Sequence, residues 1–187
     1  RQAIRDAVYA DFKKPAAEAD LTEIYAITTE IKHTARHLKK WMSRHSVGTP
    51  LPFLGSSSWV QYEPKGVCLI IAPWNFPLQL AIGPLVSAIA AGNTAIVKPS
   101  EHTPHTSAVV REIVEAVFKP EEVAVVEGAV ETATELLKLP FNHIFFTGAP
   151  AIGKIVMRAA AEHLASVTLE QGGKSPTIVD ETADLKA

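Results

Sequence analysis

From Gly66 onward, short apolar runs alternate with helical segments, and this alternation limits the fold more than any other feature of the sequence. Parallel strands require long crossover connections, so a helix between each pair of strands indicates right-handed βαβ units. Two of the runs, Val67-Cys-Leu-Ile-Ile-Ala and His143-Ile-Phe-Phe, are continuously apolar, which is typical of strands covered on both faces. The expected strands are 67–72, 94–98, 123–127, 143–147 and 167–170, and the expected helices are 78–91, 105–118, 131–138 and 151–164. The predicted fold is α/β, a Rossmann-like doubly wound parallel sheet preceded by N-terminal helices.

The spacing of apolar residues is different in the N-terminal part, and we expect residues 1–48 to be helical. Its apolar residues recur every three or four positions, which places them on one stripe of a helix: Leu21, Ile24, Ile27, Ile31, Ala35, Leu38 and Trp41. Asp20 and Glu23 resemble a capping box at the start of that helix. Residues 49–65 form a proline- and serine-containing connector with a strand at 59–63. Residues 66–187 then make up the Rossmann-like domain.

The bulk properties narrow the class of protein. A formal net charge of -2 over 187 residues gives no electrostatic reason to expect a nucleic acid or an anionic membrane as partner. The one cysteine, Cys68, excludes an intrachain disulfide and favours a reducing, cytoplasmic location. The longest apolar stretch, 78–91, is too short to span a bilayer. His33 and His37 are four residues apart but lack an evident third ligand, so we predict no metal site.

Polar and glycine residues follow four of the five expected strands. Ligands of an open parallel sheet bind beyond the carboxyl ends of its strands, so these residues mark the candidate site. They form the segments Pro73-Trp-Asn-Phe-Pro77, Lys98-Pro-Ser-Glu101, Gly148-Ala-Pro-Ala-Ile-Gly153 and Glu170-Gln-Gly-Gly-Lys174.

Each segment also has a structural explanation. Gly148 and Gly153 fit a tight turn and a closely packed helix, although a helix N-terminus also attracts a pyrophosphate. Glu101 fits a surface charge or an acceptor for ribose hydroxyls. Asn75 could shape a turn between prolines, and Glu170 could be solvated. Four such strand ends together favour a binding site over four unrelated structural features.

Four segments resemble the aldehyde dehydrogenase superfamily in order and approximate spacing. They are Ala72-Pro-Trp-Asn-Phe-Pro77, Val97-Lys-Pro-Ser-Glu101, Phe146-Thr-Gly-Ala-Pro-Ala-Ile-Gly153 and Leu169-Glu-Gln-Gly-Gly-Lys-Ser-Pro176. Near the start, Thr-Glu-Ile-Tyr at 22–25 and Ile-Lys-His-Thr-Ala-Arg-His-Leu at 31–38 resemble its class 3 and fatty-aldehyde branch. The resemblance covers essentially the whole chain.

The resemblance implies oxidation of an aldehyde to a carboxylic acid with NAD, or alternatively NADP, through a cysteine-bound acyl group. Asn75 would contribute to an oxyanion hole, and Glu170 would be the general base. The cofactor-binding residues would be Ala72, Pro73, Trp74, Lys98, Glu101, Gly148, Ala149, Gly153 and Gly172. The implied partners are an aldehyde substrate and, in the full-length enzyme, a second copy in a homodimer.

Two departures from the family pattern affect these expectations. Ala149 replaces the usual serine, which removes a hydroxyl that could reach the pyrophosphate. Gln171 replaces the usual leucine, which is expected to change the polarity around Glu170. The family's nucleophilic cysteine follows the Glu170 motif by a few dozen residues, and Cys68 lies in an apolar strand, so we expect this chain to lack the nucleophile and to be inactive alone.

Two other functions compete with this one. An acylating dehydrogenase passes the acyl group to a thiol or phosphate and does not need a hydrolytic base, so Glu170 argues against it. A non-catalytic nucleotide-binding or interaction fragment is consistent with the missing cysteine.

Overall fold

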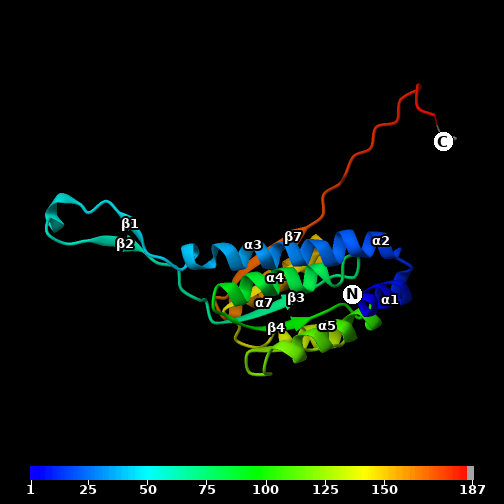
Figure 1. The fold of residues 1–187 in the computed structure, drawn as a ribbon, viewed down its shortest axis with the longest axis horizontal. Coiled ribbons are helices and arrows are strands. Elements are labelled where there is room, and N and C mark those ends of the chain that lie inside the picture. The colour runs from blue at the N-terminus through cyan, green and yellow to red at the C-terminus, as the bar shows by residue number, and fades with distance from the viewer. Residues whose placement is uncertain (185–187) are drawn as a thin grey trace.

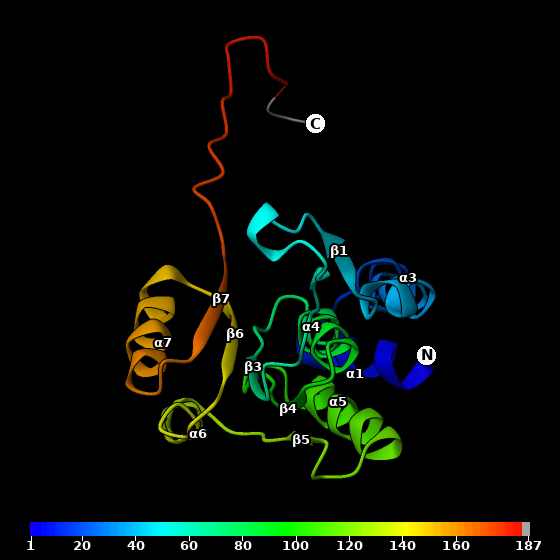
Figure 2. The same cartoon turned by 90° about the vertical axis from the view of Figure 1, so that its left-hand side faces the viewer.

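The computed structural model describes residues 1–184 (Figure 1), and its centre is a five-stranded parallel sheet in the order β5-β4-β3-β6-β7, which can be followed in Figure 2. The strands are β3 (Val67–Ile71), β4 (Thr94–Lys98), β5 (Val123–Val125), β6 (His143–Gly148) and β7 (Ser166–Gln171). The chain moves outward from β3 to β4 and β5, then returns to form β6 on the other side of β3. This reversal confirms the predicted doubly wound α/β fold.

Helices cover both faces of this sheet, and the reversal decides which helix lies on which face. Helices α4 (Gln79–Ala90) and α5 (Pro104–Val117) lie on one face, and α6 (Val130–Leu136) and α7 (Pro150–Glu162) lie on the other (Figure 2). Right-handed crossovers that run in opposite directions along a sheet place their helices on opposite faces. All four helices were expected from the sequence, and each agrees with its expected bounds to within two residues.

The two core clusters follow from alternation along β3. Cys68 and Ile70 point toward α4 and α5, whereas Leu69 and Ile71 point toward α6 and α7. Cys68 is only 3% exposed, and burial raises the pKa of its thiol, although the Lys65 charge opposes this. A buried, protonated thiol is unreactive, which agrees with the structural role expected for Cys68.

The N-terminal part contains α1 (Gln2–Phe12), α2 (Ala16–Ala19), a π-helical segment η1 (Asp20–Tyr25) and α3 (Ala26–Trp41). The expectation that helix continues to residue 48 is wrong, because β1 (His45–Val47) pairs antiparallel with β2 (Ser58–Val60). The two strands and the short 3-10 helix η2 (Leu51–Phe53) between them form an arm that projects from the body of the molecule (Figure 1). The strand expected at 59–63 therefore ends early, at Val60.

The π-helical segment also changes the expected apolar stripe. A π-helical turn shifts the faces of the residues that follow it relative to a regular helix. Ile24 and Ile27 are buried, but Leu21 is 65% exposed and Ile31 is 45% exposed. The capping-box prediction for Asp20 and Glu23 is wrong as well. The helix begins earlier, Asp20 pairs with Arg5, and Glu23 is buried against Lys14.

Asp11, at the end of α1, caps the helix that follows β4. Its two carboxylate oxygens accept hydrogen bonds from the backbone N–H groups of His105 at 3.0 Å and Thr106 at 2.8 Å. The Thr106 hydroxyl donates a further bond at 2.6 Å. Thr103 occupies the N-cap position of α5 but makes no side-chain capping bond. A carboxylate from a distant segment thus supplies the capping interaction that a helix N-terminus requires.

We expect Asp11→Ala to lower the free energy of unfolding by about 2 kcal/mol, the upper end of the range for loss of an N-cap. Urea denaturation of the chain measures this. The control is Asp6→Ala on the same helix, where the exposed carboxylate accepts a bond from the Gln2 side chain and from no other residue of the described range 1–184. That change should stay within about 0.5 kcal/mol. Equal losses in the two variants would contradict the capping role.

Candidate functional site

The carboxyl edge of the sheet brings the four predicted segments together. Strand register pairs Ile71 with both Lys98 and Phe146, so residues of β4, β3 and β6 lie on one rung of the sheet. Thr147 pairs with Glu170 on the next rung. Neighbouring strands lie about 4.8 Å apart, so four strands span roughly 15 Å. Segments separated by up to 100 residues in sequence therefore lie along one edge of the sheet, at the point where the strand order reverses and where a ligand crevice is expected.

The loop after β3 presents polar groups at this edge. Ala72 is buried, and its N–H donates to the Lys98 carbonyl oxygen at 3.0 Å, which joins the loop to the end of β4. Trp74 is 54% exposed, and the Phe12 ring meets it edge-on at 6.3 Å between centroids. Asn75 is exposed, and its side-chain amide makes no hydrogen bond within residues 1–184. This amide is available to a ligand.

A buried cation and a partly exposed carboxylate follow β4. The Lys98 Nζ donates to the Pro99 carbonyl oxygen at 2.9 Å and lies 3.1 Å from the Glu101 carboxylate. Partial burial alone would raise the pKa of Glu101, but a backbone hydrogen bond and the Lys98 ammonium outweigh this and lower it. Glu101 is therefore an ionised acceptor at the rim of the crevice.

Close packing gives Gly148 a structural reason to be glycine, whereas a Cβ on Gly153 would crowd only the movable end of the exposed Gln171 side chain. A Cβ on Gly148 would lie 2.5 Å from the Phe146 ring, and one on Gly153 would lie 2.1 Å from the Gln171 amide nitrogen. Ala149 is the N-cap residue of α7, with φ -71° and ψ 142°, and no side chain caps the helix there. The first turn of α7 contains no acidic residue. The positive end of this helix dipole is thus left uncompensated by the described residues and faces the crevice.

The expected effect of Gln171 on Glu170 is not borne out. Side chains of adjacent residues in a strand point to opposite faces. Glu170 lines a cavity on the α4 side of the sheet, whereas the Gln171 side chain lies against Gly153 of α7. The Gln171 side chain therefore lies away from the surroundings of the Glu170 carboxylate.

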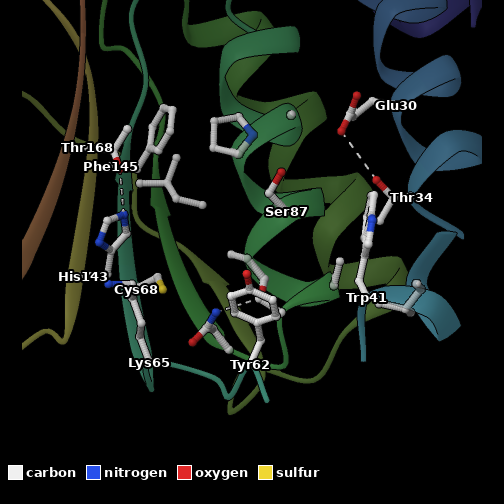
Figure 3. A pocket seen from close by; sticks show the side chains of 18 of the residues that line it. Glu30, Thr34, Trp41, Tyr62, Lys65, Cys68, Ser87, His143, Phe145 and Thr168 are labelled. Carbon is white, nitrogen blue, oxygen red and sulfur yellow. Dashed lines mark hydrogen bonds between the residues drawn. The ribbon is translucent and has the colours of Figure 1, made fainter. Parts of the chain in front are cut away.

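The cavity that Glu170 lines has a volume of about 980 Å³ and lies between α3, α4 and the face of β6 and β7. Figure 3 shows Trp41 and Thr34 of α3 on one wall and Phe145 and Thr168 on the other. On the wall formed by β6 and β7, His143 forms hydrogen bonds with the hydroxyls of Ser166 at 2.7 Å and Thr168 at 3.2 Å. Burial lowers the pKa of His143, and the Lys65 charge lowers it further, so the imidazole is held neutral.

Thr147 is a candidate that the sequence reasoning missed. Its hydroxyl oxygen is buried and has no hydrogen-bond partner among the described residues, although it neighbours Glu170 across the sheet. A buried hydroxyl without a partner is unusual, and at the edge of a cavity a water molecule or a ligand group would satisfy it. The available signal was its position as a polar residue at the end of an apolar strand.

The remaining predicted residues are less constrained. Pro73 is half-buried in the loop after β3, and Gly172 is exposed, with open space where a Cβ would lie. Within residues 1–184, no group of three or more His, Cys, Asp or Glu side chains is placed to hold a metal ion. None of the helices in this range is long and apolar enough to cross a membrane.

Comparison with known proteins places the chain in one family. The profile of the "Aldehyde dehydrogenase family" matches residues 1–187. "Aldehyde dehydrogenase family 3 member B1" of Bos taurus is 43% identical over 184 residues, which are 98% of this chain and 39% of that protein.

Two solved structures show the same fold. A substrate-bound structure of Staphylococcus aureus AldH is 47% identical with a TM-score of 0.92, covering 98% of this chain and 40% of that one. A Mycobacterium tuberculosis aldehyde dehydrogenase complexed with NAD+ is 30% identical with a TM-score of 0.81, covering 93% and 36%. The chain thus spans about 40% of the length of the curated relatives that it matches.

The N-cap residue of α7, Ala149, has no side chain that could accept a hydrogen bond from the first turn. Ala149 has the extended backbone of a good N-cap, so Ala149→Ser should raise the free energy of unfolding by about 1 kcal/mol. Urea denaturation without added ligand measures this. Ala151→Ser, inside the first turn of the same helix, is the control and should give no gain. A gain of the same size from both changes would show that the N-cap position is not special.

Proposed function

This chain belongs to the aldehyde dehydrogenase family, and we propose that it forms the cofactor-binding part of an enzyme that oxidises an aldehyde to a carboxylic acid. The observation that carries the proposal is the placement of Lys98, Thr147, Glu170 and the loop of Asn75 along one edge of the sheet. Members of this family are NAD(P)-dependent oxidoreductases, and a structural neighbour holds NAD+. When bound, NAD(P)+ accepts a hydride from the substrate.

The donors and acceptors around the crevice fit such a dinucleotide. Lys98 and Glu101 offer a cation and an ionised acceptor for the adenosine ribose. The uncapped N-terminus of α7 at Ala149 offers backbone N–H groups and a positive dipole to the pyrophosphate. The Thr147 hydroxyl, which lacks a partner among the described residues, offers a polar contact near Glu170. Trp74 and the backbone at Ala72, Pro73, Gly148, Gly153 and Gly172 would complete the walls.

Asn75 and Glu170 would act on the substrate. The exposed Asn75 amide would donate to the aldehyde oxygen as negative charge develops there, which stabilises the transition state. The exposed Glu170 carboxylate would take a proton from the nucleophile or from the water that hydrolyses the acyl group. The nucleophile would be a cysteine outside these 187 residues, because Cys68 is buried in the sheet. The exposed base favours hydrolysis over acyl transfer to a thiol or phosphate.

Three finer points remain proposals. We expect NAD to be preferred over NADP, because Glu101 would repel a 2′-phosphate. A homodimer and a cytoplasmic location are expected of the full-length enzyme.

The catalytic roles can be separated in the full-length enzyme by rapid mixing and NADH absorbance. Glu170→Gln removes the proton acceptor, so steady-state turnover should fall about 100- to 10,000-fold while a first burst of NADH persists. Asn75→Ala should suppress the burst itself, by roughly 3 kcal/mol of lost oxyanion stabilisation. Near-normal turnover in the Glu170→Gln enzyme would refute the base assignment.

The cofactor assignment can be tested on the chain itself by calorimetric titration with NAD and NADP. Glu101→Gln should reduce the preference for NAD, which we expect to be on the order of 1–2 kcal/mol for a partly solvated charge pair. Glu127→Gln is the control, since Glu127 follows β5 and pairs with Arg111 at 3.2 Å. If NADP binding is unchanged or weaker in the Glu101 variant, this residue does not contact the ribose.

A further inference from the structure

A buried ion pair lies directly behind the Asn75 loop. The Lys14 Nζ is 2.7 Å from the Glu23 carboxylate, and their side chains are 4% and 0% exposed. Lys14 comes from the turn between α1 and α2, and Glu23 comes from the π-helical segment η1. Neither residue belongs to the segments that mark the crevice.

The pair contacts both ends of the segment 75–79. Lys14 Nζ donates to the Asn75 carbonyl oxygen at 3.0 Å, and the second carboxylate oxygen of Glu23 accepts from the Gln79 N–H at 2.8 Å. Gln79 is the first residue of α4, whose N-terminus has no capping bond from its own N-cap side chain. The ammonium also lies 4.1 Å from the centroid of the Phe76 ring. Each charge is therefore satisfied by groups of the loop that carries Asn75.

Stability alone does not explain a pair of this kind. Removing two charges from water is costly, and well-packed apolar residues of similar volume often stabilise a core equally well. A buried pair does impose one geometry on the groups that it contacts. The π-helical segment, a rare conformation often found at functional sites, includes Glu23 and presents its carboxylate to the loop.

We propose that Lys14 and Glu23 are positioning residues that hold the Asn75 amide at the oxyanion position by clamping the two ends of segment 75–79. The inference rests on the proposed function, in which Asn75 acts on the aldehyde oxygen. Neither charged side chain reaches the substrate, because the described residues bury both. They act through the loop backbone.

The test uses the full-length enzyme with Lys14→Met and Glu23→Gln combined, which removes both charges and leaves neither uncompensated. The burst rate of NADH formation should fall roughly 10- to 100-fold, the scale expected for a catalytic group displaced by about 1 Å. The dissociation constant for NAD and the melting temperature should change little. Arg5→Met with Asp20→Asn is the matched control, because this more exposed pair also joins α1 to η1 but does not contact the loop. Its burst rate should equal that of the parent enzyme.

A double-mutant cycle distinguishes positioning from a general structural effect. In an Asn75→Ala enzyme, the Lys14→Met and Glu23→Gln changes should lower the burst rate no further. An unchanged burst rate in the parent background, or an equal further loss in the Asn75→Ala background, would overturn the inference. If Asn75→Ala itself leaves the burst intact, the proposed role of Asn75 fails instead, and the positioning role fails with it.

A second variant covers the case in which the double substitution does not fold. Lys14→Arg keeps the charge balance, but its wider guanidinium must displace the Asn75 carbonyl from its 3.0 Å contact. This variant should fold with a near-parent melting temperature and show a reduced burst rate. A burst rate equal to that of the parent enzyme would count against the inference.

Discussion

The parallel pairing of β3 with β4 on one side and β6 on the other is the interaction on which the rest of this structure depends. Because β3 is the first strand of the sheet and lies in the middle, the chain winds outward in one direction and then in the other. Helices are thereby placed on both faces, and the two clusters of core side chains form on either side of β3. The same pairing aligns the carboxyl ends of β4, β3, β6 and β7, so their following loops converge.

The short segment from Asp11 to Lys14 connects the N-terminal helices to the carboxyl edge of the parallel sheet. Asp11 caps α5, Phe12 packs against Trp74, and Lys14 binds the Asn75 carbonyl. These contacts reach the elements that follow both β3 and β4, so the N-terminal helices support the crevice from behind. Asn75 leaves its side-chain amide unbonded within residues 1–184, so its own side chain does not fix the loop. The contacts from Phe12 and Lys14 provide part of its support.

The side chains at the carboxyl ends of β6 and β7 point to two different faces of the sheet. Glu170 and the neighbouring Thr147 line the cavity beside α3 and α4, whereas Gly153 and Gln171 pack together on the α7 side. Gly148, one of the two glycines that resemble a phosphate-binding turn, is also favoured by close packing against the Phe146 ring. Close packing and phosphate binding both favour glycine after β6. The glycine pattern in the sequence therefore does not show which of the two explains it.

The sequence by itself determined the class of fold, the helices and strands from Gly66 onward and the four segments at the sheet edge. The helices and strands follow from local apolar periodicity, which can be read directly from the order of residues. The position of the four segments follows from the rule that parallel strands joined by crossovers end at the same edge of the sheet. The π-helical segment, the β1–β2 arm, the direction of Gln171 and the pairing of Lys14 with Glu23 were decided only by the tertiary structure. Each depends on contacts between residues that are far apart in the sequence. Glu23, for example, is buried because the Lys14 ammonium neutralises its carboxylate and the Gln79 N–H donates a hydrogen bond to it. A charged residue on a helix otherwise predicts a solvated face, and only the fold shows that this one is enclosed.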